Sequence, residues 1–283
     1  MWIGPGAIAE EPEPPKLVGR CIVEQLDEEP FSEWFRSGYE EYTPNAEVLD
    51  ALRSVETGDV HVSVFFGTWC GDSRREVPWW LKLFDAMDIP NERVELVAVD
   101  NSDETHKRSP DGEERGLEIY RVPTLIVRRG GAEVARVVEY PVLSIERDLL
   151  AILGGRPYEP NYASYPVIRR WLRDGLLGDP NVSPRGLAGE IRHVVSGEGE
   201  VTAAARVLLS RGDTAQAVKL FQVNCALHRD SSSCQTRLAD ALLETGDHEQ
   251  ARKAAERALR LNDDPDRVEF LVRLIERSRV EPS

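Results

Sequence analysis

The sequence has few cysteines and no long hydrophobic run. Only four of its 283 residues are cysteine, too few for a disulfide-stabilised scaffold, so we expect a reducing, cytoplasmic setting. The longest uncharged stretch lies between Asp59 and Asp72 and is shorter than the ~20 residues that a membrane-spanning helix needs. The N-terminal residues carry neither a basic start nor a long apolar segment, so they do not resemble a secretory signal.

Positive charge is also in short supply. Lys and Arg number 35 against 50 Asp and Glu, which gives a net charge of −15, and the excess lies almost entirely in the first hundred residues. Such a chain repels phosphate backbones and anionic lipid. We therefore expect neither a nucleic-acid partner nor a membrane partner. The 41% of apolar residues is enough for a packed core, and the length suggests two domains.

A mixture of helical and strand patterns fills residues 31–157. The aromatic and apolar spacing of residues 31–56 is helical. Short β-rich runs predict buried strands at 60–66, 94–99, 124–128 and 133–138. Further helices are expected over 72–87 and, after Ser144 as N-cap, up to Leu153. This order predicts a small mixed sheet with helices on both faces.

The flanking segments differ in composition from this region. Residues 1–30 include an acidic, proline-rich stretch at 10–16 and are expected to be a partly disordered lead-in. Residues 158–197 are rich in Pro, Gly and Asn. We interpret them as a helical connector, with helices expected over 165–177 and 187–195.

From residue 198 to 283 the chain repeats itself at a spacing of 34 residues, so that Gly212 aligns with Gly246. A 34-residue helix–turn–helix period is typical of the tetratricopeptide repeat (TPR), and this region resembles that family. The resemblance implies an all-α module that docks a protein partner. Asn224 stands where the family usually has Ala. Because isolated arrays need about three or more units, we expect the two clear ones to be supported by a capping helix over 266–279, by the connector or by the first domain.

The segment Trp69-Cys70-Gly71-Asp72-Ser73 follows a predicted strand and starts a predicted helix. A helix N-terminus presents unpaired N–H groups and partial positive charge. Both stabilise a thiolate, which is the nucleophilic form of cysteine. Cys70 is therefore the candidate catalytic nucleophile.

Together with Val122-Pro123-Thr124, about fifty residues later, this motif resembles the thioredoxin family over residues 58–153. The segments at 67–78 (GTWCGDSRREVP) and 138–141 (VEYP) are similar to a bacterial thioredoxin-like group with a W-C-G-D-S site. The resemblance implies an α/β thioredoxin-like fold in which Pro123 is cis and the Val122 backbone pairs with an extended peptide or protein substrate. It assigns the substrate groove to Trp69, Gly71, Asp72, Val122, Pro123 and Thr124.

The sequence departs from this family at two positions. Ser73 replaces the second cysteine of the family motif, so a mixed disulfide at Cys70 would be released by an outside thiol or by another cysteine such as Cys21. Val64 replaces a buried acid that accepts a proton. These departures favour thiol–disulfide exchange through one cysteine, with Ser73 hydrogen-bonded to the thiolate. No cofactor and no metal are implied.

Other interpretations stay open. The fold could be a redox-silent interaction scaffold in which the repeats provide the function, or a reductase for a small peroxide or glutathione conjugate. Cys225, His228 and Cys234 could bind zinc, or the two cysteines could form a disulfide. Because Cys225 aligns with the core position of Leu259, packing as a small apolar side chain is favoured.

Overall fold

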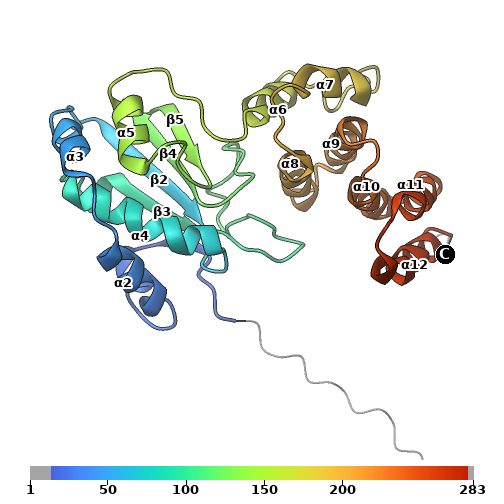
Figure 1. The fold of residues 1–283 in the computed structure, drawn as a ribbon, viewed down its shortest axis with the longest axis horizontal. Coiled ribbons are helices and arrows are strands. Elements are labelled where there is room, and N and C mark those ends of the chain that lie inside the picture. Colours follow the sequence, from blue (N-terminus) through green and yellow to red (C-terminus); the bar gives the residue numbers. More distant parts are fainter. Residues whose placement is uncertain (1–13, 280–283) are drawn as a thin grey trace, which may run out of the picture.

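The computed structural model describes residues 14–279 and places a mixed α/β part beside an all-helical part (Figure 1). The α/β part contains a five-stranded sheet in the order β1-β3-β2-β4-β5. Only β2 and β3 pair in parallel, and the other neighbours are antiparallel. The strands are β1 (Gly19–Cys21), β2 (Val60–Phe66), β3 (Val94–Ala98), β4 (Thr124–Arg129) and β5 (Ala132–Val138).

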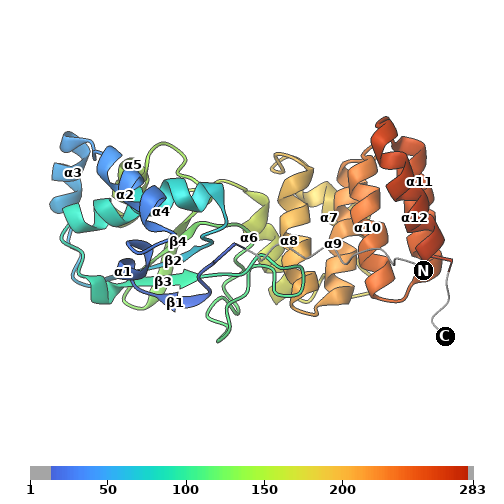
Figure 2. The ribbon, with the colours of Figure 1, turned by 90° about the horizontal axis from the view of Figure 1, so that it is seen from below.

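The helices of the α/β part cover one face of this sheet. They bury their apolar sides against alternate residues of β2, such as Val64 and Phe66, and Figure 2 shows α2 to α5 on the same side of the strands. These helices are α1 (Val23–Leu26), α2 (Ser32–Glu41), α3 (Ala46–Arg53), α4 (Gly71–Ala86) and α5 (Ile145–Leu153).

The expectation of helices on both faces is wrong. The other face carries a smaller cluster in which Phe65 and Ile126 pack against Ile119 and Val122. The covering segment, residues 99–123, contains no helix or strand. Its polar residues instead form turns, for example around Asp100, whose carboxylate accepts a hydrogen bond from Ser102 at 2.8 Å.

The expected lead-in of residues 1–30 needs a partial correction. Residues 1–13 lie outside the described part, but residues 19–21 form edge strand β1, which pairs with β3 from Gly19 opposite Ala98 to Cys21 opposite Leu96. A three-residue strand offers no alternation pattern, and its partner is far along the chain. The sequence around residues 19–21 therefore carries no periodic signal of a strand.

The helical part forms pairs of antiparallel helices, with α8 against α9 and α10 against α11. Gly212 and Gly246 adopt positive φ at the two intra-pair turns, as an abrupt turn after a helix favours. No helix between residues 14 and 279 has both the length and the apolarity to cross a bilayer. The helices are α6 (Ser164–Arg173), α7 (Pro184–Ile191), α8 (Glu198–Ser210), α9 (Thr214–Leu227), α10 (Ser232–Glu244), α11 (His248–Leu261) and α12 (Val268–Arg277).

Two connector helices differ from the predicted boundaries. Helix α6 ends four residues before the expected position, because Gly175 turns the chain with a φ of 75°. Helix α7 begins three residues earlier than expected. Ser183 accepts a hydrogen bond from the Gly186 amide at 3.1 Å, and Pro184 occupies the first helical position, which is favourable there.

Asn224, which stands where the repeat family usually has Ala, forms hydrogen bonds between neighbouring helices, and the cysteines of the repeats lie in the core. The Nδ2 atom of buried Asn224 donates to the Glu198 carbonyl at 3.0 Å and to Thr202 Oγ1 at 2.9 Å, so it joins α9 to α8. Cys225 and Cys234 are both free thiols buried in the helical core. Cys225 therefore packs as a small core residue.

The helical part rests on the turn-rich segment of the α/β part. The Ser210 hydroxyl donates to the His106 carbonyl at 3.0 Å, and Arg108 donates to the Ser210 carbonyl at 3.0 Å. Tyr120 and Val138 of the α/β part join the hydrophobic core of the helices. The two repeat units thus gain support from the connector, from α12 and from the α/β part.

Candidate functional site

Cys70 lies where β2 gives way to α4. It is the N-cap residue of this 16-residue helix and is half-buried. Its Sγ atom donates a hydrogen bond to the Val122 carbonyl at 3.4 Å. The following Val122–Pro123 bond is cis, as expected. The structure therefore brings the thiol, a helix N-terminus and the backbone before Pro123 together.

Trp69, which precedes Cys70 in the first motif, and Thr124, which follows Pro123 in the second, are each held by a hydrogen bond to the backbone. The Trp69 indole donates to the Val99 carbonyl at 2.8 Å, and its ring lies over Gly67, where a Cβ atom would come within 2.5 Å of the ring. The Thr124 hydroxyl is buried and donates to the Arg121 carbonyl at 2.7 Å. Each of these side chains is thus fixed by a backbone hydrogen bond.

Ser73 does not occupy the position expected of it. Its fully buried Oγ accepts a hydrogen bond from the Gly67 amide at 3.1 Å, so it ties the end of β2 to the start of α4. No hydrogen bond joins it to Cys70 in the part of the chain that the structure describes. Ser73 therefore supports the turn that positions the thiol.

The charges at the start of α4 largely cancel. Asp72 pairs with Arg75 at 2.8 Å, and Arg75 also contacts Glu76 at 2.9 Å. Arg74 is occupied by the Thr68 carbonyl, to which it donates at 2.6 Å. The acidic residues of the motif are thus compensated locally, and the helix N-terminus remains the main source of positive potential from α4 itself.

Lys107 is a site residue that sequence reasoning missed. It belongs to the polar segment after β3, yet only 9% of its surface is exposed. Its ammonium lies 5.9 Å from the centre of the Trp69 ring and 2.9 Å from His106 Nε2. Burial, the largest influence, and the charge of Arg206 lower the Lys107 pKa to about 8, while Cys70 raises it. A cation thus sits within electrostatic reach of the thiol.

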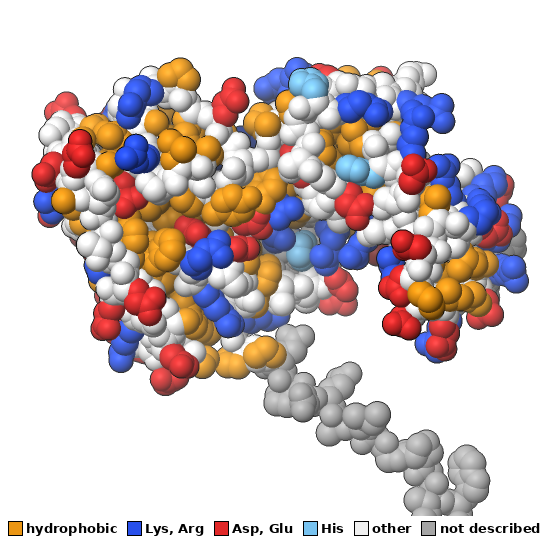
Figure 3. Space-filling model, viewed as in Figure 1, with side chains coloured by type: hydrophobic (Ala, Val, Ile, Leu, Met, Phe, Trp, Pro, Cys, Tyr) orange, Lys and Arg blue, Asp and Glu red, His pale blue; other side chains and the backbone are white. Residues whose placement is uncertain are grey.

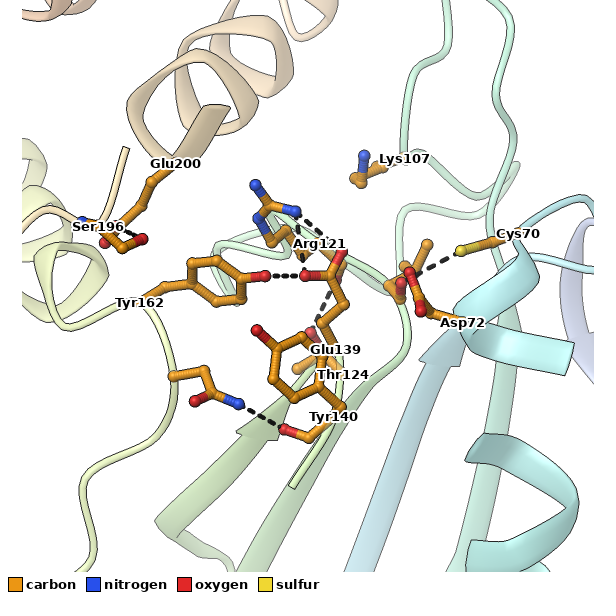
Figure 4. Close-up of polar contacts among 12 residues, drawn as sticks. Cys70, Asp72, Lys107, Arg121, Thr124, Glu139, Tyr140, Tyr162, Ser196 and Glu200 are labelled. Carbon is orange, nitrogen blue, oxygen red and sulfur yellow. Dashed lines mark hydrogen bonds and ion pairs between the residues drawn. The ribbon is translucent and has the colours of Figure 1, made fainter. Parts of the chain in front are cut away.

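A second cluster joins the cis-proline loop to the connector (Figure 4). Arg121 donates to Glu139 at 2.8 Å and to the Tyr165 hydroxyl at 2.9 Å. Its guanidinium also lies 4.3 Å from the centre of the Tyr162 ring, and Tyr162 donates to Glu139. Glu139 and Tyr162 both adopt a φ of 67°, a strained conformation for these residue types that the cluster stabilises.

Figure 4 places Lys107 between this cluster and Cys70. The charges of Arg121 and Glu139 also act on Lys107, the first lowering and the second raising its pKa. Lys107 is therefore linked electrostatically both to the thiol and to the Arg121 cluster.

Cys21 is poorly suited to resolve a disulfide at Cys70. Burial raises the pKa of its thiol to about 12, which disfavours the reactive thiolate. Strand β3 also separates β1 from β2, so Cys21 is two strand spacings, about 9.5 Å, from the backbone of β2. A disulfide needs Cα atoms about 4.4–6.8 Å apart.

The remaining candidate, the zinc site at Cys225, His228 and Cys234, does not form. Across residues 14–279, no three His, Cys, Asp or Glu side chains are arranged to hold a metal ion.

Comparison with known proteins identifies the C-terminal helices. No curated protein and no solved structure matches the chain. A family model of the tetratricopeptide repeat matches residues 208–274, which run from the end of α8 into α12 and include the turns at Gly212 and Gly246. This agrees with the 34-residue period of the sequence and with the paired helices of the structure, and the match supports a protein–protein interaction module in this part of the chain.

Proposed function

We propose that the α/β part is a thioredoxin-like unit that performs thiol–disulfide exchange through Cys70 on a protein docked by the repeats. The observation that carries the proposal is the placement of the Cys70 thiol at the N-terminus of α4, 3.4 Å from the Val122 carbonyl. The Val122 backbone would pair with an extended substrate strand, as it does in the family. A cytoplasmic setting stays a prediction.

The exchange uses the substrate disulfide as its oxidant and a thiol from outside the chain as its reductant. The Cys70 thiolate attacks one sulfur of a substrate disulfide, a new S–S bond forms, and the other sulfur leaves as a thiolate. A second thiolate, such as that of glutathione, then attacks the substrate sulfur of the mixed disulfide. A new S–S bond forms between glutathione and the substrate, and the Cys70 sulfur leaves as a thiolate. Because Ser73 replaces a local second cysteine and Cys21 is distant, the releasing thiol comes from outside the chain.

The proposal is tested with a peptide whose single cysteine is activated as a disulfide with thionitrobenzoate. The full chain is mixed with this peptide, and intact mass spectrometry follows the mixed disulfide. Wild type and a Cys21→Ser control should each gain one peptide that glutathione removes, whereas Cys70→Ser should gain none. An adduct of equal yield in Cys70→Ser, or no adduct in wild type, would show that Cys70 is not the exchanging thiol.

The match to the repeat family also favours a second function, a redox-silent scaffold. In that case the α/β part serves as a rigid support for the repeats, and Cys70 is a spectator. The two functions differ in one measurement. If the chain is a scaffold, wild type forms no glutathione-sensitive adduct at any pH.

A further inference from the structure

The repeats and the α/β part together enclose a groove. Its volume is about 560 Å³. One wall is the turn around Asp103 and His106, and the other consists of residues of α8 and α10, such as Arg206 and Asp240, with α12 at its end. Figure 3 shows a hollow on this face, between the α/β part and the C-terminal helices. The groove is therefore not a property of the repeats alone.

The α10 side of the groove holds carboxylates that lack a direct partner. Within residues 14–279, neither Asp240 nor Glu244 forms an ion pair or a hydrogen bond. Burial raises the pKa of both carboxyls, and for Glu244 the negative charges of Asp240 and Asp103 add to the effect. Arg277 and Arg237 oppose this shift at Asp240 without contacting it.

Arg206, on the α8 side of the groove, already has an ion-pair partner. Arg206 donates to Asp103 at 3.0 Å, so its charge is already matched across the groove. A cationic side chain entering near α10 would relieve the repulsion between Asp240 and Glu244, whereas an anionic one would increase it. Arg237 and Arg277 also line the groove and act on Asp240, whereas the charges that act on Glu244 are those of Asp240 and Asp103. Charge complementarity therefore favours a basic occupant beside Glu244.

One turn of the chain connects the groove to the surroundings of the thiol. His106, which is 6% exposed, lines the groove and has no hydrogen-bond partner at Nδ1. The next residue, Lys107, lies at the Trp69 ring and within reach of the Cys70 charge. The hydrogen bond from Ser210 to the His106 carbonyl holds this turn against α8. Two consecutive residues, His106 in the groove and Lys107 at the Trp69 ring, thus link the groove to the Cys70 site.

We propose that this groove binds an extended segment of a protein partner that carries a Lys or Arg side chain, which Asp240 and Glu244 receive, and that the bound segment presents its disulfide to Cys70. The binding of the segment is independent of the proposed exchange at Cys70, whereas the presentation of its disulfide rests on that proposed function. The bond changes are those of the exchange described above. What the proposal adds is that docking and chemistry occur on one and the same polypeptide segment.

Two measurements test this proposal with two peptide probes of equal length. One probe carries two lysines and the other two glutamates, and each holds one cysteine activated with thionitrobenzoate. The first measurement is the rate of thionitrobenzoate release, divided by the rate with Ellman's reagent, which needs no docking. The second is the affinity of the unactivated peptides for the Cys70→Ser chain, followed by fluorescence anisotropy.

The basic probe should bind and react better than the acidic one. In the double variant Asp240→Asn/Glu244→Gln, the ratio of the affinities of the basic and the acidic probe should fall roughly five- to tenfold, and so should the ratio of their normalised reaction rates. The loss of two partly exposed ion pairs predicts an effect of this size. The matched control is Glu249→Gln/Glu269→Gln, which removes two exposed carboxylates outside the groove, and it should behave as wild type.

Equal binding of the two probes, or an unchanged preference in the α10 double variant, would overturn the proposal. Binding that is normal in the Cys70→Ser chain, together with no reaction of wild type toward Ellman's reagent, would instead contradict the exchange function and leave the docking half supported. The two failures are therefore distinguishable.

Discussion

The hydroxyl of Ser210, at the end of α8, donates a hydrogen bond to the backbone carbonyl of His106 at 3.0 Å. These residues are 104 positions apart in the chain, and the bond holds a turn of the α/β part against the first repeat helix. The neighbour of His106, Lys107, then lies against Trp69. The surroundings of the Cys70 thiol are therefore built partly by the repeats.

Lys107 should activate Cys70. We expect Lys107→Met to slow alkylation of Cys70 by iodoacetamide roughly three- to tenfold at pH 7, because a nearby cation stabilises the thiolate. Since the Lys107 pKa is lowered to about 8, its charge is lost as the pH rises through 8. The ratio of the wild-type to the variant rate should therefore approach one above that pH. Lys253→Met, on the exposed side of α11, is the control, and a constant ratio across pH would refute this role.

His106 should make the protein sensitive to acid. Burial, followed by the charges of Lys107 and Arg206, lowers its pKa from 6.5 to about 3. As the pH falls below 6.5, the unfolded chain takes up a proton that the folded chain takes up only near pH 3, so stability is lost over this window. His106→Gln should flatten the decline in the free energy of unfolding, measured with urea between pH 7 and 4. The same change at exposed His61 should not, and a decline as steep as that of wild type would contradict the assignment.

The pair of Glu118 and Arg211 should stabilise the junction. They lie 2.9 Å apart, with side chains 17% and 15% exposed, and two guanidinium nitrogens of Arg211 are buried without partners. Glu118→Gln leaves this cation less compensated and should lower the free energy of unfolding by about 1–3 kcal/mol. Glu269→Gln, in an exposed pair with Arg273, should cost at most about 0.5 kcal/mol. Equal losses in the free energy of urea unfolding would show that the Glu118–Arg211 pair stabilises the protein no more than the exposed pair does.

Gly67 and Gly71 should respond differently to the same substitution. A Cβ at Gly67 would lie 2.5 Å from the Trp69 ring, whereas one at Gly71 meets nothing within 4 Å. Gly67→Ala should displace the indole, cost about 1–3 kcal/mol and alter tryptophan fluorescence. Gly71→Ala, in the first turn of α4, should leave stability equal or slightly higher, since Ala favours a helix. Thermal unfolding of both variants measures the difference. A similar loss of stability in Gly67→Ala and Gly71→Ala would mean that the Trp69 ring does not lie against Gly67.

The elements with strong patterns were predictable, because their signal is local. Strand β2 was predicted with both ends correct, and the start of α4 within one residue, since a β-branched run and a glycine-rich break mark them. The 34-residue period located the repeats for the same reason. The cis bond before Pro123 followed from the resemblance of the motif.

The missed features depend on distant partners. Strand β1 exists because β3 offers it an edge, and its three residues carry no pattern of their own. Lys107 looks like any residue of a polar loop until Ser210 and Arg206 fold that loop over Trp69. Ser73 was expected to contact the thiol, but the amide of Gly67 competes for its oxygen. In each case the deciding contact involves a residue that local periodicity does not reveal.

The charge of Arg206 acts on Lys107, and Lys107 in turn acts on Cys70. The helical part therefore does more than hold a partner near the α/β part: through Lys107 it contributes to the electrostatic surroundings of the thiol. A chain cut after residue 157 would keep the sheet, α4 and Cys70, yet lose the helix that holds the Lys107 turn. Reactivity measured on such a fragment would describe a different thiol, and a partner that shifts α8 on binding would change thiol reactivity without touching the sulfur.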